Sequence, residues 1–300
     1  MQTSSKLLSS TKPYHTPPRS RPVCRDVRAL SIEPHVDPAG GKPALYTLRL
    51  TSPGWKSWAS GQFVMIRPAK MRRPDVFWAR PFSIFQDDGK ELHIYFQLSG
   101  RETQEMPHLR EGETVTIWGP LGNAFAVSPV GPTLILAGGI GIAPFVSYIE
   151  THPAPATLHL EFGHRLHEDC YPLARCKCAE QQGAIIHNNR EYGPADLARA
   201  ISIQENSIKE IASRNGLVLA CGPLPFLRSV HAFASRYGAK TQLSLESRMG
   251  CGIGACLGCV VKSTVSERAR STASDTPPEF HYVQTCVKGP IFWADQIDLA

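Results

Sequence analysis

Polar and apolar residues alternate through the first part of the chain. Between about residues 23 and 128, apolar side chains recur at every second position, as in ALYTLRL (44–50) and ELHIYFQL (91–98). Such alternation is typical of strands that bury one face. Similar segments, GQFVMIRP (61–68) and ETVTIWGP (113–120), lie between turn-rich breaks. The pattern predicts an antiparallel β-barrel or sandwich over residues 23–128.

The pattern changes at about residue 129, just after the start of the proline-containing segment VSPVGP (127–132). Short apolar runs now recur with helix-like segments between them, and these runs are TLILAG, TLHLEFG, GLVLACGP and KTQLSLES. Fully apolar short runs are typical of parallel strands covered by helices on both faces. We therefore expect an α/β parallel-sheet domain over residues 129–245, and an α+β multidomain fold for the whole chain.

The first 22 residues are basic, rich in Ser and Pro, and contain no acidic residue. Such a composition cannot bury enough apolar surface to fold, so we expect a disordered tail over residues 1–22. A transit peptide has the same composition and remains an alternative, whereas the missing apolar core of a secretory signal disfavours export.

Composition limits the class of protein further. Three hundred residues suit two domains, and the net charge of +6 comes from scattered Lys and Arg, without the basic and aromatic stripe of a nucleic-acid-binding surface. Nine cysteines, an odd number without a secretory signal, indicate a reducing compartment. We therefore expect a cytoplasmic protein.

A glycine-rich turn follows the first strand of the predicted α/β domain. The stretch LILAGGIGIAPF places Gly138, Gly139 and Gly141 between a buried strand and a helix that begins near Pro144. Backbone N–H groups at such a helix N-terminus suit a phosphate group, and the first β-to-α turn is where nucleotide sites lie. A purely structural tight turn is the alternative, because Pro144 stands where the full G-x-G-x-x-G motif has its last glycine.

Two polar residues interrupt an apolar strand in WARPFSIF (78–85). Arg80 suits a phosphate group, and Ser83 can present a hydroxyl to a ring nitrogen of a planar cofactor. The structural alternative is a strand edge, because Pro81 cannot donate to a β-ladder and the Arg80 head group can reach water.

Four cysteines near the C-terminus form the pattern C-x4-C-x2-C followed by a distant cysteine. They are Cys251, Cys256, Cys259 and Cys286. The reducing compartment disfavours disulfides, and structural zinc usually takes two C-x2-C pairs, of which this segment has one. The pattern is that of a plant-type [2Fe–2S] cluster, and the glycines between the cysteines allow a tight loop whose N–H groups face the sulfurs.

Together these motifs resemble the ferredoxin-NADP reductase superfamily. The resemblance rests on R-P-x-S, then GPLGNAF (119–125), the glycine turn, and ACGPLPFL (220–227), in that order. It implies that Arg80 binds the flavin diphosphate, that Ser83 lies near the flavin N5, and that Cys221 approaches the nicotinamide. The cofactor-binding set implied by the resemblance is Arg80, Pro81, Phe82, Ser83, Gly100, Thr103, Gly122, Gly138, Gly139, Gly141 and Gly222.

The cysteine loop narrows the resemblance. LESRMGCGIGACLGCVVK and CVKGPIFWADQIDL closely resemble the electron-transfer subunits of the NAD-linked, class 1B dihydroorotate dehydrogenase family. This implies an FAD-binding barrel over 23–128, an NAD-binding domain over 129–245 and a [2Fe–2S] segment over 246–300. It also implies an FMN-containing catalytic partner subunit, a heterotetramer, and a role in pyrimidine biosynthesis. Reductase subunits of other complexes, such as hydrogenase, sulfite reductase or ferredoxin:NADP oxidoreductase types, and a non-catalytic zinc-binding module remain alternatives.

The sequence departs from the family pattern at three places. Residues 263–280 form a polar insertion, Glu102 replaces the second glycine of a G-x-G-T stretch, and IIHNNREYGPADL (185–197) lacks the expected acidic and glycine-rich residues. After the second α/β strand, Arg165 suits a 2′-phosphate and Glu161 a ribose hydroxyl, with a surface salt bridge as the alternative for each. The eleven histidines show no metal-binding spacing along the chain.

Overall fold

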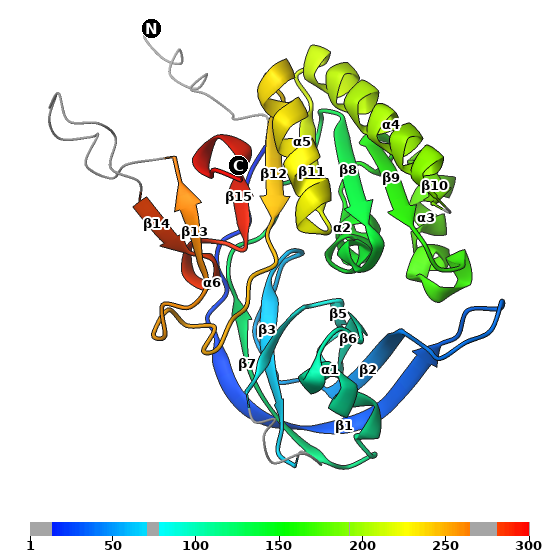
Figure 1. Ribbon diagram of the computed structural model, residues 1–300. Coiled ribbons are helices and arrows are strands. Elements are labelled where there is room, and N and C mark those ends of the chain that lie inside the picture. The colour runs from blue at the N-terminus through cyan, green and yellow to red at the C-terminus, as the bar shows by residue number, and fades with distance from the viewer. Residues whose placement is uncertain (1–13, 71–77, 192, 265–280, 300) are drawn as a thin grey trace, which may run out of the picture.

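The structure, a computed structural model, describes residues 14–70, 78–191, 193–264 and 281–299. Two sheets dominate it: a curled antiparallel sheet built from the N-terminal part of the chain, and a parallel sheet flanked by helices (Figure 1). Residues 265–280 of the predicted insertion 263–280, together with residues 1–13, lie outside the described residues.

The curled sheet has seven strands in the order β4-β3-β7-β1-β2-β6-β5. Their bounds are β1 Val23–His35, β2 Leu45–Thr51, β3 Phe63–Pro68, β4 Arg80–Ser83, β5 Gln86–Asp87, β6 Glu91–Gln97 and β7 Thr114–Leu121. The two edge strands, β4 and β5, are consecutive in the chain, so the segment that joins them connects the two edges of the sheet. The antiparallel barrel expected from the period-two pattern is confirmed.

Alternation explains the core of this sheet. Leu48 and Leu50 on β2 and Leu92 and Ile94 on β6 are fully buried on the inner face. The partners in register across the two strands are Leu48 with Ile94 and Leu50 with Leu92. Directly opposed pairs of this kind keep the register, because a slip by one residue would turn every apolar side chain outward.

The second sheet has the order β10-β9-β8-β11-β12-β15. Its strands are β8 Thr133–Gly138, β9 Leu158–His164, β10 Ile185–Arg190, β11 Leu217–Cys221, β12 Lys240–Ser244 and β15 Ile291–Trp293. All pair in parallel except β15, which pairs antiparallel with β12. From β8 the chain adds β9 and β10 on one side of the sheet, and it then crosses to the other side of β8 to add β11 and β12. The direction in which strands are added therefore reverses between β8 and β11, and open α/β sheets bind ligands at such a point.

Helices cover both faces of the parallel sheet. α2 (Ala143–Thr151) and α3 (Lys177–Gln181) pack on one face, while α4 (Pro194–Ser213) and α5 (Leu224–Tyr237) pack on the other. The strands β8 and β11 alternate between these two cores, which explains why they read as continuous apolar runs. In the part of the chain that the structure describes, every helix is too short or too polar to cross a membrane.

The C-terminal segment contributes to more than the cysteine loop. β13 (Val260–Ser263) and β14 (His281–Gln284) form a small antiparallel sheet, and α6 (Thr285–Lys288) carries Cys286. The chain then returns to the α/β sheet as β15. The segment predicted to hold a cluster therefore also completes the edge of the parallel sheet.

Part of the N-terminal segment expected to be disordered lies against the body. His15 pairs with Val127 through two backbone hydrogen bonds, and the ring of Tyr14 packs on Trp293 at 5.1 Å between centroids. Ser20 donates to Gln62. The described residues 14–22 thus differ from the expected tail, because two aromatic rings and a backbone ladder provide contacts that composition does not reveal.

Phe125 joins the two domains. Its ring, 1% exposed, stacks on Phe145 at 4.7 Å and meets Tyr148 edge-on at 6.3 Å. Phe125 follows the barrel strand β7, whereas Phe145 and Tyr148 lie on α2. One apolar core therefore extends from the barrel into the α/β domain.

We expect Phe125→Ala to lower the free energy of unfolding by about 3–5 kcal/mol, because it removes a buried ring and leaves a cavity. Urea unfolding followed by fluorescence and circular dichroism measures the change. The control is Val130→Ala, because Val130 is exposed in the linker between the domains. Equal unfolding midpoints for the two variants would contradict a role for Phe125 in joining the domains.

Candidate flavin, nucleotide and iron–sulfur sites

Strand β4 places the predicted R-P-x-S motif at an edge of the curled sheet. β4 pairs antiparallel with β3, with Arg80 opposite Ile66 and Ser83 opposite Phe63. All four motif residues are half-buried. Between them, Phe82 packs edge-on against Phe96 at 5.7 Å, which anchors the strand to the barrel core. The motif is therefore held rigidly while its polar groups remain accessible.

Arg80 forms an ion pair with Glu102. Glu102 lies in the first turn of the short helix α1 (Arg101–Glu105), whose N-cap is Gly100. The Thr103 hydroxyl accepts hydrogen bonds from the backbone N–H groups of Ser99 and Gly100 at 2.9 and 3.0 Å. The structure thus brings Arg80 together with Gly100 and Thr103, which were predicted from a second segment, and places a carboxylate among them.

The glycine turn meets the Cys221 segment where the strand order reverses. A Cβ at Gly141 would lie 2.2 Å from the Cys221 carbonyl oxygen, and one at Gly222 would lie 3.2 Å from Gly138 Cα. Gly139 has a φ of +55°, and a Cβ there would meet nothing within 4 Å. The turn therefore packs tightly on one side and leaves its backbone open on the other, before helix α2, which suits a pyrophosphate.

Cys221 ends β11 and is buried. Burial raises the pKa of its thiol to about 12, and Glu246 acts in the same direction. The thiol is therefore neutral at physiological pH. A neutral buried thiol suits apolar contact with a flat ring rather than nucleophilic chemistry.

The cysteine loop between Cys251 and Cys259 needs its glycines. Gly252 and Gly254 have φ of +71° and +86°. A Cβ at Gly252 would lie 2.5 Å from Met65 Cγ, and one at Gly254 would lie 2.7 Å from Val287 Cγ2. Both positions combine a left-handed backbone with close packing, so any side chain would push the loop away from its neighbours.

The thiols of this loop interact with each other and with backbone N–H groups. The Cys256 N–H donates to Cys251 Sγ at 3.4 Å. Burial alone would raise the pKa of Cys251, but N–H groups such as those of Ile253 and Cys256 outweigh it and lower the pKa to about 7. Burial and the neighbouring Cys259 raise the pKa of Cys286 to about 12. Convergent thiols with N–H donors fit the predicted [2Fe–2S] cluster.

The cysteine loop lies directly against the barrel. Cys259, Cys286 and Met249 share a small apolar core with Phe63 and Met65 of strand β3. The Trp118 indole on β7 donates to the Cys251 carbonyl at 2.9 Å. Ala79, which directly precedes Arg80, belongs to the same core, and β3 also pairs with β4, so the cysteine loop lies beside the Arg80–Ser83 motif.

Several residues that hold these sites were not predicted from the sequence. The Thr285 side chain and backbone N–H both donate to the Cys259 carbonyl, at 2.8 and 2.7 Å, and Gln284 donates to the Gly254 carbonyl at 2.6 Å. Their position just before Cys286 was an available signal. No signal in the sequence indicated that Glu102 pairs with Arg80, because the two residues lie in separate segments of the chain.

The structure adds packing information for two of the residues considered above, and the predicted cofactor contact of Gly122 stays a prediction. Gly122 has a φ of +75°, and a Cβ there would lie 2.5 Å from Pro290 Cδ, so packing against the C-terminal segment already explains this glycine. Glu161, considered for a ribose hydroxyl or a surface salt bridge, is only 7% exposed in the middle of β9 and bonds to His159 and His187. The expected pairing of Glu161 is present, with His159 and His187 as partners, but its carboxylate is buried between the two strands rather than on the surface.

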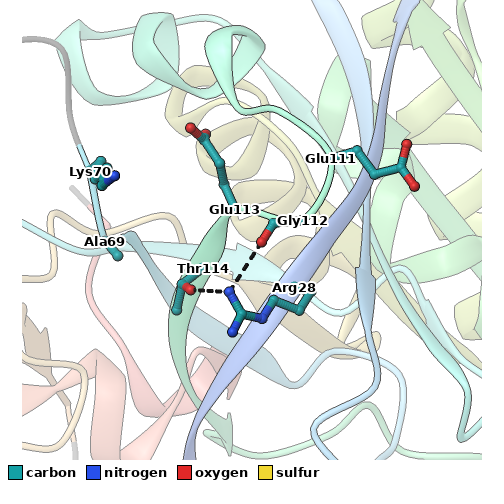
Figure 2. A pocket seen from close by; sticks show the side chains of 7 residues that line it. All are labelled: Arg28, Ala69, Lys70, Glu111, Gly112, Glu113 and Thr114. Carbon is teal, nitrogen blue, oxygen red and sulfur yellow. Dashed lines mark hydrogen bonds between the residues drawn. The ribbon is translucent and has the colours of Figure 1, made fainter.

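A hollow of about 380 Å³ lies elsewhere on the barrel. Figure 2 shows Arg28 reaching across it to the Gly112 carbonyl and the Thr114 hydroxyl, at 3.1 and 2.6 Å. Its lining is Arg28, Ala69, Lys70, Glu111, Gly112, Glu113 and Thr114. It contains none of the predicted site residues, so it is separate from the sites described above.

Comparison with known proteins agrees with this arrangement. Residues 246–298 match the family described as the iron-sulfur cluster binding domain of dihydroorotate dehydrogenase B. The chain is 32% identical over 241 residues to the dihydroorotate dehydrogenase B (NAD(+)) electron transfer subunit of Lysinibacillus sphaericus (strain C3-41), covering 77% of this chain and 84% of that one. The subunit of the same name from Listeria monocytogenes serovar 1/2a is 30% identical over 266 residues, covering 85% and 93%.

Solved structures share the fold. A chain from a structure of NADH-dependent reduced ferredoxin-NADP oxidoreductase superposes with a TM-score of 0.68 at 19% identity, covering 91% of this chain and 90% of that one. A ferredoxin-NADP+ reductase mutant from Plasmodium falciparum gives 0.59 at 12% identity, covering 73% and 96%. The reductase-type fold predicted from the sequence is confirmed.

We expect Gly252→Ala to lower the iron content of the purified protein to well below half of the wild-type value. A methyl group at this position would collide with Met65 and strain the left-handed backbone, so the cysteines would lose their common geometry. Iron analysis and visible absorbance measure the loss. Gly40→Ala is the control, because Gly40 also has a positive φ but open space around it. Equal iron in both variants would contradict the steric argument.

Proposed function

The chain belongs to the family of dihydroorotate dehydrogenase B electron transfer subunits, and from this we propose that it passes electrons from a dihydroorotate-oxidising subunit to NAD+. In this proposal electrons enter at the [2Fe–2S] cluster, pass to FAD and leave as a hydride to NAD+. The reaction belongs to pyrimidine biosynthesis, as the family does. The relatives' name, electron transfer subunit of an NAD(+)-linked dehydrogenase, supports this direction.

The observation that carries the proposal is the packing of the cysteine loop on strand β3, beside the Arg80–Ser83 motif of β4. A cluster held by this loop would be close to a flavin held by β4. FAD, when bound, exchanges single electrons with the cluster and a hydride with nicotinamide, so it belongs between the two. The order of sites on the protein then matches the order of electron transfer.

Each predicted residue has a role consistent with its surroundings. Arg80 would pair with the flavin diphosphate, with Gly100 and Thr103 beside it, and Ser83 at the end of β4 would lie near the reactive edge of the flavin ring. At the β8–β11 junction, Gly138, Gly139, Gly141 and Gly222 would give the dinucleotide pyrophosphate access to backbone N–H groups. The neutral thiol of Cys221 would lie against the nicotinamide ring.

The four cysteines would each supply a thiolate to the cluster. Cys256 and Cys251 are the more exposed of the four, while Cys259 and Cys286 are buried. Electrons would therefore enter through the Cys251–Cys256 side of the loop, where a partner can approach closely. The apolar side chains of Ile253 and Leu257, 62% and 67% exposed, lie on this part of the loop and suit a protein partner.

The partner in this proposal is an FMN-containing catalytic subunit, in a cytoplasmic heterotetramer. A subunit named for electron transfer requires a second subunit that oxidises the substrate. The odd number of cysteines supports a reducing compartment. Co-expression with an FMN-binding dihydroorotate-oxidising subunit, followed by mass determination of the purified complex, tests the partner and the stoichiometry.

The test of the electron path is an anaerobic titration with NADH, which runs the chain in reverse. We expect the flavin bands and the iron–sulfur bands both to bleach, because both centres exchange electrons with nicotinamide through this chain. Visible absorbance measures both sets of bands. Bleaching of the flavin alone in protein with full iron content would contradict the proposed path, and a colourless, zinc-containing protein would support the zinc-module alternative.

Glu102 should weaken flavin binding, because its carboxylate competes with the diphosphate for Arg80 and repels it. We expect Glu102→Gln to tighten FAD binding about tenfold, equivalent to about 1.4 kcal/mol, and Arg80→Ala to weaken it. Fluorescence titration of the deflavinated protein measures the dissociation constant. Glu111→Gln, an exposed change of the same charge, is the control. Weaker FAD binding in Glu102→Gln would mean that the carboxylate positions Arg80 instead.

A further inference from the structure

Two histidines and a glutamate converge on strands β9 and β10, away from the sites described above. His159 and Glu161 lie two residues apart on β9, and His187 is the register partner of Glu161 on β10. Their neighbours in the strands, Leu158, Leu160 and Ile186, belong to the core under α2 and α3. Because side chains alternate along a strand, the three polar residues lie together on the opposite face of the sheet.

The ligand-type atoms of these residues are close to one another. Glu161 Oε1 lies 2.8 Å from His159 Nε2 and 2.7 Å from His187 Nδ1, and the two histidine nitrogens are 3.3 Å apart. The three atoms therefore form a compact triangle. Among the described residues, the potential ligand atoms of His159, Glu161 and His187 all lie within 4.8 Å of one another, close enough to share one metal ion.

This triangle fits a tetrahedral metal ion. For Zn–N bonds of about 2.0–2.1 Å, two ligands of a tetrahedron are about 3.3 Å apart. The distance between the histidine nitrogens already has this value. The two nitrogen–oxygen distances are those of hydrogen bonds, and each needs to open by about half an ångström, which a change of carboxylate torsion provides.

The surroundings provide two further features of a metal site. Asn189 Nδ2 donates to the second carboxylate oxygen, Glu161 Oε2, at 3.0 Å, and so fixes the orientation of the carboxylate. Such outer hydrogen bonds are typical of metal-ligating carboxylates. Glu161 is buried, whereas the His187 side chain is 54% exposed, so solvent reaches the group on the side of β10 and can supply a water ligand.

The protonation of the group is consistent with metal binding. Burial would raise the pKa of Glu161, but the hydrogen bonds from His159 and His187 outweigh it and lower the pKa. The carboxylate is therefore ionised at neutral pH. Both histidines direct a ring nitrogen at one oxygen, where a divalent cation would replace their protons.

We propose that His159, Glu161 and His187 bind one zinc ion, with water as the fourth ligand. The ion links the edge strand β10 to β9, and the site is independent of the cysteine cluster and of the electron-transfer function. Zinc suits the two imidazoles and one carboxylate in tetrahedral geometry.

The test is calorimetric titration of zinc chloride into the oxidised holoprotein with full iron and FAD content, so that the four cluster cysteines are occupied. We expect one equivalent of zinc to bind to the wild type. His187→Gln should weaken binding more than tenfold, and Asn189→Ala should weaken it about 10- to 100-fold, as loss of an outer partner does. His108→Gln, which changes an exposed histidine on the barrel, should bind zinc as the wild type does.

A second probe identifies the ligands directly. Oxidised FAD and the oxidised [2Fe–2S] cluster give no electron paramagnetic resonance signal, so copper(II) added to the holoprotein reports its own surroundings. Hyperfine coupling to two nitrogens, lost in His187→Gln, supports the site. Equal zinc affinity in the wild type and His187→Gln would overturn the proposal. The variant keeps every thiol, and its substitution lies at an exposed position that should not disturb folding, so the zinc would then be bound elsewhere. Absence of zinc binding to the wild type would overturn it equally.

Discussion

The close contact between the cysteine loop and strand β3 is the constraint on which the electron-transfer arrangement depends. Gly252 lies so near Met65 that a single methyl group would separate them, and Trp118 holds the Cys251 carbonyl from the neighbouring strand. Because β3 also pairs with β4, this contact would set how far a cluster held by the loop lies from the proposed flavin motif. Electron transfer requires short distances between centres, so the close packing at Gly252 would also serve the proposed electron path.

A second close contact organises the nucleotide site. Gly141 packs on the Cys221 carbonyl and Gly222 packs on Gly138, so the ends of β8 and β11 meet without side chains between them. The same glycines leave the backbone of the turn open at Gly139. The core centred on Phe125 then holds the barrel against helix α2, and so fixes the proposed flavin motif relative to the proposed nucleotide turn. Packing and ligand access are therefore two results of the same small residues.

Two carboxylates of low exposure, one half-buried and one buried, are each held by specific partners. Glu102 pairs with Arg80, and Glu161 with two histidines, and in both cases a charged group with low exposure is satisfied by specific partners. A carboxylate of low exposure is costly to leave unpaired, so a ligand that takes its partner must compensate for the lost interaction. Each pair is therefore a place where ligand binding and the existing ion pair compete. In the proposals above, a phosphate would compete for Arg80, and a metal ion would replace the protons between the histidines and Glu161. Both pairs connect fold stability to ligand binding.

Local patterns in the sequence determined the strand-rich first domain, the parallel strands of the second, the glycine turn and the spacing of the four cysteines. These features depend on neighbours in the chain, since side-chain periodicity and loop length are local properties. The edge strand β10 was not predicted, because IIHNNR has no continuous apolar run and its outer face is exposed.

Tertiary structure alone decided which distant residues meet. Arg80 meets Glu102 across the barrel edge, the cysteine loop rests on β3, and His159 meets His187 through the register of two parallel strands. Histidine spacing along the chain could not reveal that last pair. The contact arises where one strand lies beside another, and strand pairing depends on the whole sheet rather than on either segment.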